Sequence, residues 1–181
     1  MSLQHSFLGL LERGPQHGYS LKQQYDDAFG GQRDLRFGQV YATLARLEKA
    51  AFAEVATVEA GDGPDRKTYV ITADGVSELE SWLDATEPAD KLSPTALHTR
   101  VIVSLLTGRP VEQVLDAQRR VHIAQMRALR SENIGASLER RLTIDFLIGQ
   151  LNAELEWIEL AGQRIADPSY VLGAGSAGGA Q

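Results

Sequence analysis

The sequence of 181 residues predicts a mainly α-helical protein with one small β-hairpin, divided into two helical parts. Apolar residues recur every three or four positions through most of the chain, as they do on one face of a helix. Two β-prone stretches flank a loop rich in glycine, aspartate and proline, which is typical of a hairpin. Near the C-terminal end, apolar residues follow a heptad spacing, as in helices packed along their length. The chain has no cysteine, which excludes disulfides and thiol chemistry.

The first half of the chain contains three predicted helices. The first starts near Leu3 and ends at Gly14-Pro15, and the second runs from about Tyr19 to the glycine pair at 30–31. Glycine accepts the positive φ angle that closes a helix. The third helix is expected over Phe37–Ala50. With a turn of about 100° per residue, its inner face is an apolar stripe formed by Phe37, Val40, Leu44 and Leu47.

A hairpin and a fourth helix follow the third helix. The stretches Phe52–Val58 and Lys67–Ile71 are β-prone, and the loop between them is rich in turn residues. Thr72 stands at the expected N-cap of the fourth helix, which Pro88 ends. The resulting order is three helices, a strand, a long loop, a second strand and a helix. This is the order of a winged helix-turn-helix, in which the loop is the wing.

The outer face of the third helix has the composition that a DNA-reading helix needs. The major groove is about 12 Å wide, so small residues such as Gly38 and Ala45 allow close approach. Glutamine suits a bidentate contact with adenine, and arginine suits one with guanine. Hydroxyls beside this face, and bases at the wing, suit contacts with phosphates. The predicted DNA-binding residues are Gln39, Tyr41, Ala42, Thr43, Arg46, Lys49, Arg66 and Lys67.

Three stretches resemble the PadR-type transcriptional regulators, the phenolic-acid repressor family. They are HGYSLKQQYDDAFG at 17–30, FGQVYATLARLEKAAF at 37–52 and DRKTYVITADGVSELESWL at 65–83. Two positions depart from the family pattern. Ala51 stands where the family usually has glycine, and we expect this change to cost little. Phe37-Gly38-Gln39 stands where the family more often has a serine- or proline-rich sequence.

The resemblance implies a homodimeric repressor whose winged helices bind a palindromic operator in double-stranded DNA. We therefore expect a winged helix-turn-helix DNA-binding domain at 1–88 and a helical domain at 89–170. The helical domain would serve dimerisation, and effector binding if an effector exists. The remaining residues, 171–181, are expected to be a disordered tail, because glycine, alanine and serine dominate it and bury little apolar surface.

The last predicted helix, about Ser137–Ala166, is the clearest signal in the second half. It carries a heptad seam, and we expect this seam to hold two chains together. Phe146, Leu147 and Trp157 lie off the seam, so a second face of the helix also needs a partner. The alternative is a three-helix bundle within one chain that uses the same residues. The predicted dimerisation residues are Ile144, Ile148, Leu151, Leu155, Ile158 and Ile165.

The sequence offers no support for catalysis. The four histidines are scattered, and no pair has metal-ligand spacing. No glycine loop that could hold a phosphate precedes a helix. We therefore expect no enzyme activity, no cofactor and no metal. A small aromatic effector is a further hypothesis, with Trp82 and Trp157 as candidate pocket residues, although indoles are more often packing residues.

Charge leaves one alternative open. Residues 1–86 hold eight basic and thirteen acidic side chains, so a winged helix that binds proteins instead of DNA is the second hypothesis. The bases around the third helix favour DNA. No apolar run reaches the roughly 18 residues of a membrane helix, and no signal peptide is recognisable, so we expect a cytoplasmic protein without membrane contact.

Overall fold

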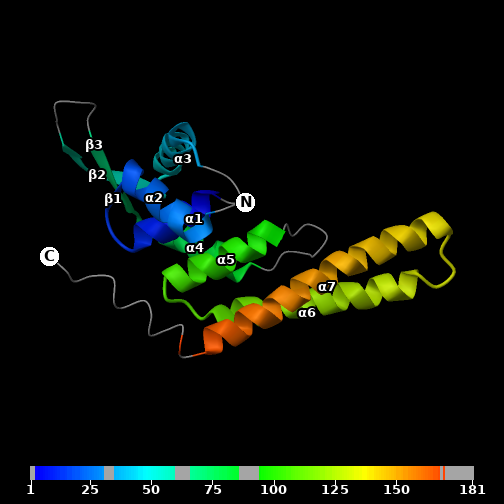
Figure 1. Ribbon diagram of the computed structural model, residues 1–181. Helices are drawn as coiled ribbons and strands as arrows, with labels where there is room; N and C mark the ends of the chain where they lie inside the picture. Colours follow the sequence, from blue (N-terminus) through cyan, green and yellow to red (C-terminus); the bar gives the residue numbers. More distant parts are fainter. Residues whose placement is uncertain (1–2, 31–34, 60–65, 86–93, 168, 170–181) are drawn as a thin grey trace. The chain divides into compact units, whose positions relative to one another are not determined.

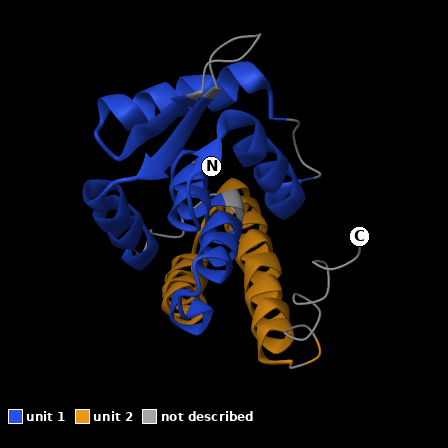
Figure 2. Ribbon diagram, turned by 90° about the vertical axis from the view of Figure 1, so that its left-hand side faces the viewer, with its two compact units in different colours: residues 1–85, 92–114 blue, residues 86–91, 115–181 orange. Residues whose placement is uncertain are grey.

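The computed structural model describes residues 3–30, 35–59, 66–85, 94–167 and 169 (Figure 1). These residues fall into two compact units. Unit 1 comprises residues 1–85 and 92–114, and unit 2 comprises residues 86–91 and 115–181 (Figure 2). Each unit is described below by itself. The predicted tail at 171–181 lies outside the described residues.

Unit 1 is built on three helices whose apolar faces meet in one core. They are α1 (Leu3–Glu12), α2 (Gly18–Phe29) and α3 (Phe37–Lys49), close to the predicted positions. Because their buried residues recur at helical spacing, each helix buries one face and exposes the other. The core includes Phe7, Leu8, Leu10, Leu11, Leu21, Tyr25, Leu35, Val40, Leu44 and Leu47.

A small antiparallel sheet completes the winged module. It contains β1 (Gln16–His17), β2 (Ala53–Glu59) and β3 (Arg66–Ile71), in the spatial order β1-β3-β2. The hairpin of β2 and β3 was predicted. Strand β1 was not, because its two residues are too few to carry a periodic signal. Gln16 helps to fix it there, since its buried amide donates to the Leu10 carbonyl oxygen at 3.0 Å.

Helix α4 (Ala73–Asp84) begins at the predicted cap. The Thr72 hydroxyl accepts a hydrogen bond from the Gly75 amide at 3.0 Å, which satisfies a donor that the first turn leaves open. Gly75 has a packing reason to be glycine: a Cβ atom there would lie 2.0 Å from the Phe52 carbonyl oxygen. Glycine at this position therefore allows α4 to lie directly against the start of β2, and any larger residue would clash there.

The connection between α3 and β2 corrects one expectation. Ala51 has a φ of 60°, in the left-handed region that L-residues rarely adopt. The Phe52 amide donates to the Leu47 carbonyl oxygen and the Ala51 amide to that of Glu48, which is the Schellman pattern of hydrogen bonds. Glycine fits this position without strain, whereas alanine costs about 1–2 kcal/mol. The sequence analysis expected alanine at residue 51 to cost little, but the φ angle shows that it destabilises this helix end.

Helix α5 (Pro94–Leu106) belongs to unit 1. The predicted division at residue 88 had assigned this helix to the C-terminal helical domain. It packs against α1, and a Cβ atom at Gly9 would lie 2.8 Å from a methyl carbon of Val103. Val103 is fully buried in the core of unit 1. The Arg109 guanidinium donates to the Glu12 carboxylate at 2.9 Å and thereby also ties this segment to α1. The proline-rich segment before α5 had suggested a domain boundary that the packing does not follow.

Unit 2 is dominated by two long helices, α6 (Val111–Glu132) and α7 (Leu138–Ala166). They run antiparallel, because residue numbers increase along α6 while those of their partners on α7 decrease. The ion pairs that show this are Arg119–Glu159, His122–Glu154 and Glu132–Arg140. Figure 1 shows the two helices side by side. Their apolar contact is formed by Met126, Leu129, Ile144 and Leu151, with Leu147, Ile148 and Leu155 packed against it. In the described part of the chain, no helix is long and apolar enough to cross a membrane.

Candidate nucleic-acid interface

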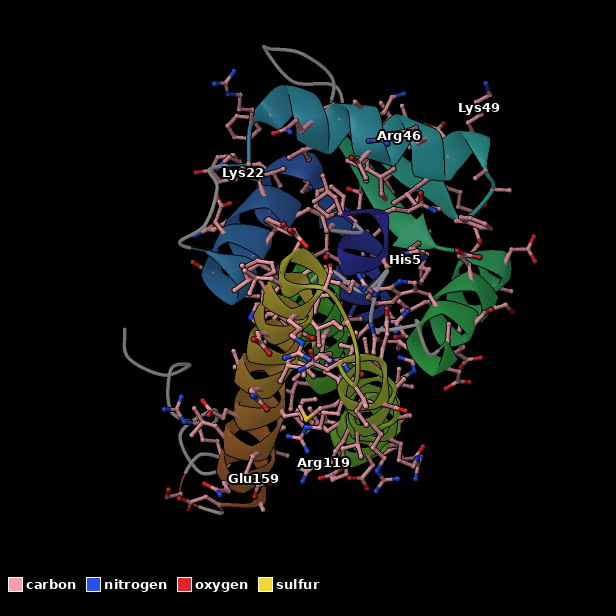
Figure 3. All side chains as sticks on the ribbon, turned by 90° about the vertical axis from the view of Figure 1, so that its right-hand side faces the viewer. His5, Lys22, Arg46, Lys49, Arg119 and Glu159 are labelled. Atoms are coloured by element: carbon pink, nitrogen blue, oxygen red, sulfur yellow. The ribbon has the colours of Figure 1, made fainter. Side chains whose placement is uncertain are left out.

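Helix α3 presents an outer face that combines small side chains with positive charge. Val40, Leu44 and Leu47 are fully buried, which turns Gly38, Ala42 and Ala45 outward. A Cβ atom at Gly38 would meet no atom within 4 Å, so this end of the helix is open. Arg46 and Lys49, labelled in Figure 3, are exposed on the same helix. The face can therefore come close to a polyanion and attract it.

The Arg46 side chain folds back along α3. Its Nε donates to the Ala42 carbonyl oxygen at 3.1 Å, and its Nη2 donates to the Thr43 hydroxyl at 3.0 Å. A guanidinium has five N–H donors, so three remain for a base edge or a phosphate. The two bonds within the helix hold the group in place before any ligand arrives.

Thr43 corrects one predicted contact. Its side chain is only 1% exposed, and its hydroxyl accepts from Arg46. A phosphate cannot reach a hydroxyl in that position. On a helical wheel Thr43 lies at the margin of the buried stripe, where the sequence pattern does not separate inside from outside. Thr43 is therefore a support for Arg46 and not a phosphate ligand in this structure.

Gln39 has a local role that competes with base reading. Its side-chain oxygen accepts a hydrogen bond from the Arg36 amide at 3.1 Å, which caps the first turn of α3. A bidentate contact with adenine needs both the oxygen and the amide nitrogen of glutamine. The cap uses one of the two lone pairs of this oxygen and thereby restricts the orientation in which the amide can meet adenine.

The wing contributes fewer described groups than the sequence predicted. Lys67 is exposed at the start of β3, and its carbonyl oxygen lies 3.3 Å from the His17 ring nitrogen Nδ1. The side chain of Arg66 and residues 60–65 at the wing tip lie outside the described part of the chain. The described part of the hairpin therefore adds one lysine to the positive groups of α3.

Three exposed aromatic residues form a cluster that sequence reasoning missed in part. Tyr19, Phe37 and Tyr41 are 65%, 44% and 53% exposed. Tyr19 stacks on Phe37 with ring centroids 5.9 Å apart, and the Lys22 ammonium lies 5.5 Å from the centre of the Phe37 ring. Phe37 had been placed in the buried stripe, but as the first residue of α3 it lies beyond the core that the later turns cover. Its position at the helix start was the available signal.

The buried Tyr69 of β3 is influenced by the charge of helix α3. Burial raises the pKa of the Tyr69 phenol, and the nearby Glu48 carboxylate and Tyr41 raise it further. Tyr69 therefore stays neutral well beyond physiological pH. The positive groups of α3 are opposed on that helix by Glu48, which is exposed.

The predicted dimer seam is used within the chain. Ile144 and Ile158 are fully buried and Leu151 is 5% exposed, while Ile148, Leu155 and Ile165 are half-buried. Ile144 and Leu151 pack with Met126 and Leu129 of α6. A heptad seam shows that a helix has a partner along its length but not whether this partner belongs to the same chain. Part of this seam therefore packs on α6, which favours the alternative of a bundle within one chain, and a role of the six residues in dimerisation stays a prediction.

The two tryptophans occupy different units. Trp82 of α4 is half-buried; the His5 ring stacks on it at a centroid distance of 4.4 Å, and the Arg100 guanidinium lies 5.4 Å from its ring centre. Trp157 of α7 is also half-buried. Since protein groups already contact the Trp82 ring, its environment is that of a packing residue. An effector role for Trp82 and Trp157 stays a prediction.

The elements of unit 1 define a winged helix-turn-helix protein with a positively charged third helix. The model of the "Transcriptional regulator PadR-like family" matches residues 7–81, which covers this module up to α4. Over these residues the chain is similar to the PadR-like family of transcriptional regulators.

Individual proteins with similar sequences are named as transcriptional regulators. A probable transcriptional regulator from Mycobacterium tuberculosis is 28% identical over 149 residues, which cover 80% of this chain and 79% of that one. The negative transcriptional regulator PadR from Bacillus subtilis is 29% identical over 86 residues, about half of each chain. Among solved structures, Bacillus subtilis PadR in complex with operator DNA has a TM-score of 0.45 and 22% identity, covering 87% of this chain and 96% of that one.

Proposed function

We propose that this regulator binds double-stranded DNA in a sequence-specific manner, with the N-terminal part of α3 in the major groove. The outer face of α3 carries this proposal, because small residues there allow approach to base edges while Arg46 and Lys49 supply charge. Lys67 on β3 is a candidate for contact with the phosphate backbone. Arg66 stays a proposed wing contact on the strength of its charge and position in the sequence.

We propose further that binding represses transcription. The relative from Bacillus subtilis is named a negative regulator, and a protein bound over a promoter excludes polymerase without needing a catalytic group. A non-enzymatic role and a location in the cytoplasm, with the DNA, are parts of this proposal. Release by a small aromatic effector belongs to the same proposal and rests on the family resemblance alone.

A second copy of the chain is the proposed partner of α7. The outer face of this helix exposes a row of apolar side chains, of which Leu138, Leu142 and Phe146 are 69%, 61% and 65% exposed and Leu160 is 45% exposed. We call these four residues the outer stripe. Gly149 lies between them along the helix, and a Cβ atom there would meet nothing within 4 Å. Exposed apolar rows of this length are typical of interaction surfaces.

Geometry and charge favour an antiparallel pair of α7 helices. If a two-fold axis passes near Gly149, Leu138 of one copy lies opposite Leu160 of the other, because both are eleven residues from the centre. The same axis brings Arg141 of one copy beside Glu156 of the other, on the same flank of both helices. Opposite charges that meet across an interface fix its register.

A two-fold protein implies an inverted repeat in the operator, with half-sites about one helical turn or a multiple apart. The test is selection of binding sites from a random double-stranded DNA library, followed by anisotropy titrations of the enriched site. Enrichment of an inverted repeat and loss of its recognition in Arg46→Ala support the proposal. Binding without any enriched sequence would contradict specific recognition and favour the protein-binding alternative.

The dimer is tested separately by light scattering at micromolar concentration. Leu142→Asp places a charge on the outer stripe, where the side chain is exposed in the single chain, so the variant should fold but become monomeric. The charge-reversed pair Arg141→Glu with Glu156→Arg should dimerise better than either single variant. A wild-type protein that is monomeric and still binds a non-repeated site tightly would refute the dimeric repressor.

A further inference from the structure

The aromatic cluster of Tyr19, Phe37 and Tyr41 lies where a recognition helix meets DNA. Phe37 is the first residue of α3, and Tyr41 follows one turn later. In helix-turn-helix proteins the N-terminal residues of this helix contact base edges. Each of the three rings is more than 40% exposed, so the cluster presents an apolar surface to solvent that no described part of the chain covers. An apolar surface at this place suits contact with an apolar group of a ligand, which the charged residues of α3 do not provide.

The rings are held in place before any ligand arrives. Phe37 is stacked on Tyr19 and lies close to the Lys22 ammonium. Tyr41 is packed against α2, since a Cβ atom at Gly18 would lie 2.9 Å from its ring. Gly38 lies between Phe37 and Tyr41 in the sequence of α3, and a Cβ atom there would meet no atom within 4 Å, so the space beside this residue is open. A small apolar group can therefore enter next to the rings without displacing another side chain.

The major groove offers one such group. Thymine presents a C5-methyl there, whereas the other edges in the groove present hydrogen-bond donors and acceptors. Phenylalanine is among the side chains that make apolar contact with this methyl. The exposed Arg46 on the same helix suits the surrounding phosphates, whereas the Lys22 ammonium is paired with the Asp26 carboxylate. The hydrogen-bonding residues Gln39 and Arg46 read other features, so the methyl would be recognised independently of them.

We propose that Phe37 and Tyr41, supported by Tyr19, read the methyl groups of thymines in each half-site of the operator. This inference rests on the proposed function, because it requires α3 to enter the major groove. It goes beyond the proposed function because it names the base that is recognised, thymine, and the group of that base that is contacted, the C5-methyl. The selectivity is apolar: it depends on the presence of a methyl group and not on the hydrogen-bonding pattern of the thymine–adenine pair.

The first test compares two selections from random double-stranded DNA, one made with thymidine and one with deoxyuridine, which lacks the C5-methyl. The thymidine selection should enrich thymine at fixed positions near the outer edge of each half-site. Replacement of such a thymine by deoxyuridine in the enriched site should weaken binding about fourfold, the ratio expected for burial of one methyl-sized group. Deoxyuridine at other positions should have no effect.

Variants then assign the effect to the rings. Phe37→Ala should bind the thymidine and deoxyuridine sites equally, because it removes the apolar contact. Tyr41→Phe keeps its ring and should retain the preference. Gln23→Ala, an exposed residue of α2 outside the cluster, is the matched control and should behave as wild type. Circular dichroism of each variant verifies that the helices are intact.

The outcomes separate the two proposals. If no library yields an enriched site, the proposed function fails, and this inference fails with it. If a site is enriched but deoxyuridine binds as well as thymidine at every position, specific DNA binding stands and methyl recognition is refuted. If the thymidine preference persists in Phe37→Ala, the methyl is read elsewhere and the assignment to the cluster is wrong.

Discussion

Ala51 offers a direct test of how backbone strain is stored at the end of the recognition helix. Its φ of 60° lies in the left-handed region, and the hydrogen bonds of the Schellman pattern hold it there. Ala51→Gly removes the clash of Cβ with the backbone and changes nothing else, because the side chain is exposed and is a single methyl group. We expect the variant to be more stable than the wild type.

The magnitude follows from two opposing contributions. Relief of the left-handed conformation stabilises the folded state by about 1–2 kcal/mol. Glycine also gives the unfolded chain more freedom, which offsets about 0.4–1 kcal/mol. The difference between these two ranges runs from 0 to about 1.6 kcal/mol, so we expect a net gain of about 0.8 kcal/mol. For a chain of this length, that shift raises the melting temperature by about 1–4 °C.

The neighbouring Ala50 is a matched control. It is also exposed, but its φ of −82° and ψ of −1° lie in the ordinary right-handed region. Ala50→Gly relieves no strain and only increases the freedom of the unfolded chain, so it should lower stability by about 0.4–1 kcal/mol. Thermal and urea denaturation followed by circular dichroism measure both variants. If Ala51→Gly lowers stability as Ala50→Gly does, the strain argument is wrong.

Three further predictions follow from the same structure. Arg66→Ala with Lys67→Ala should reduce the slope of log Kd against log salt by about 1–2 units for every DNA sequence, which titrations at several salt concentrations measure. Arg46→Ala should cost about 1–3 kcal/mol of discrimination at particular base pairs, and an unchanged base-substitution series would remove Arg46 from the reading set. Burial lowers the pKa of His5 in the folded protein, although the hydrogen bond that the ring donates to the Glu78 carboxylate opposes this shift. The unfolded state therefore binds more protons, and stability should fall as pH drops below about 6.5. Urea titrations at several pH values should show a weaker fall in His5→Gln.

Much of the winged module was predictable because its signals are local. The order of elements followed from apolar spacing, from the turn-rich loop and from Thr72, whose cap is present in the structure. Strand β1 was missed, since two residues that pair with a distant strand leave no local pattern. The strain at Ala51 was underestimated for a related reason: the cost depends on a φ angle that only the assembled helix end reveals.

The candidate site was predictable in residue type but not in detail. A helical wheel assigns faces, yet it treats all turns alike. Phe37 lies at the first turn, beyond the core, and is exposed; Thr43 lies at the margin of the buried stripe and is covered. Hydrogen bonds within the helix also decide which groups are ready for DNA. Gln39 caps the helix, and Arg46 donates to the Ala42 carbonyl oxygen one turn earlier in α3. Neither hydrogen bond follows from residue spacing.

Helix α7 shows why periodicity alone does not separate a seam between two chains from a seam within one chain. The heptad seam is the more regular of its two apolar faces, and regularity suggested a long partner of identical sequence. The connection to α6 is short, so α6 reaches this seam first within the same chain and buries Ile144 and Leu151. The second face, with Leu142 and Phe146, stays exposed in the chain. Aspartate at Leu151 should therefore unfold the hairpin of α6 and α7, whereas aspartate at Leu142 should leave its helices intact and affect only association. Equal loss of helicity in the two variants would mean that both faces are covered within one chain.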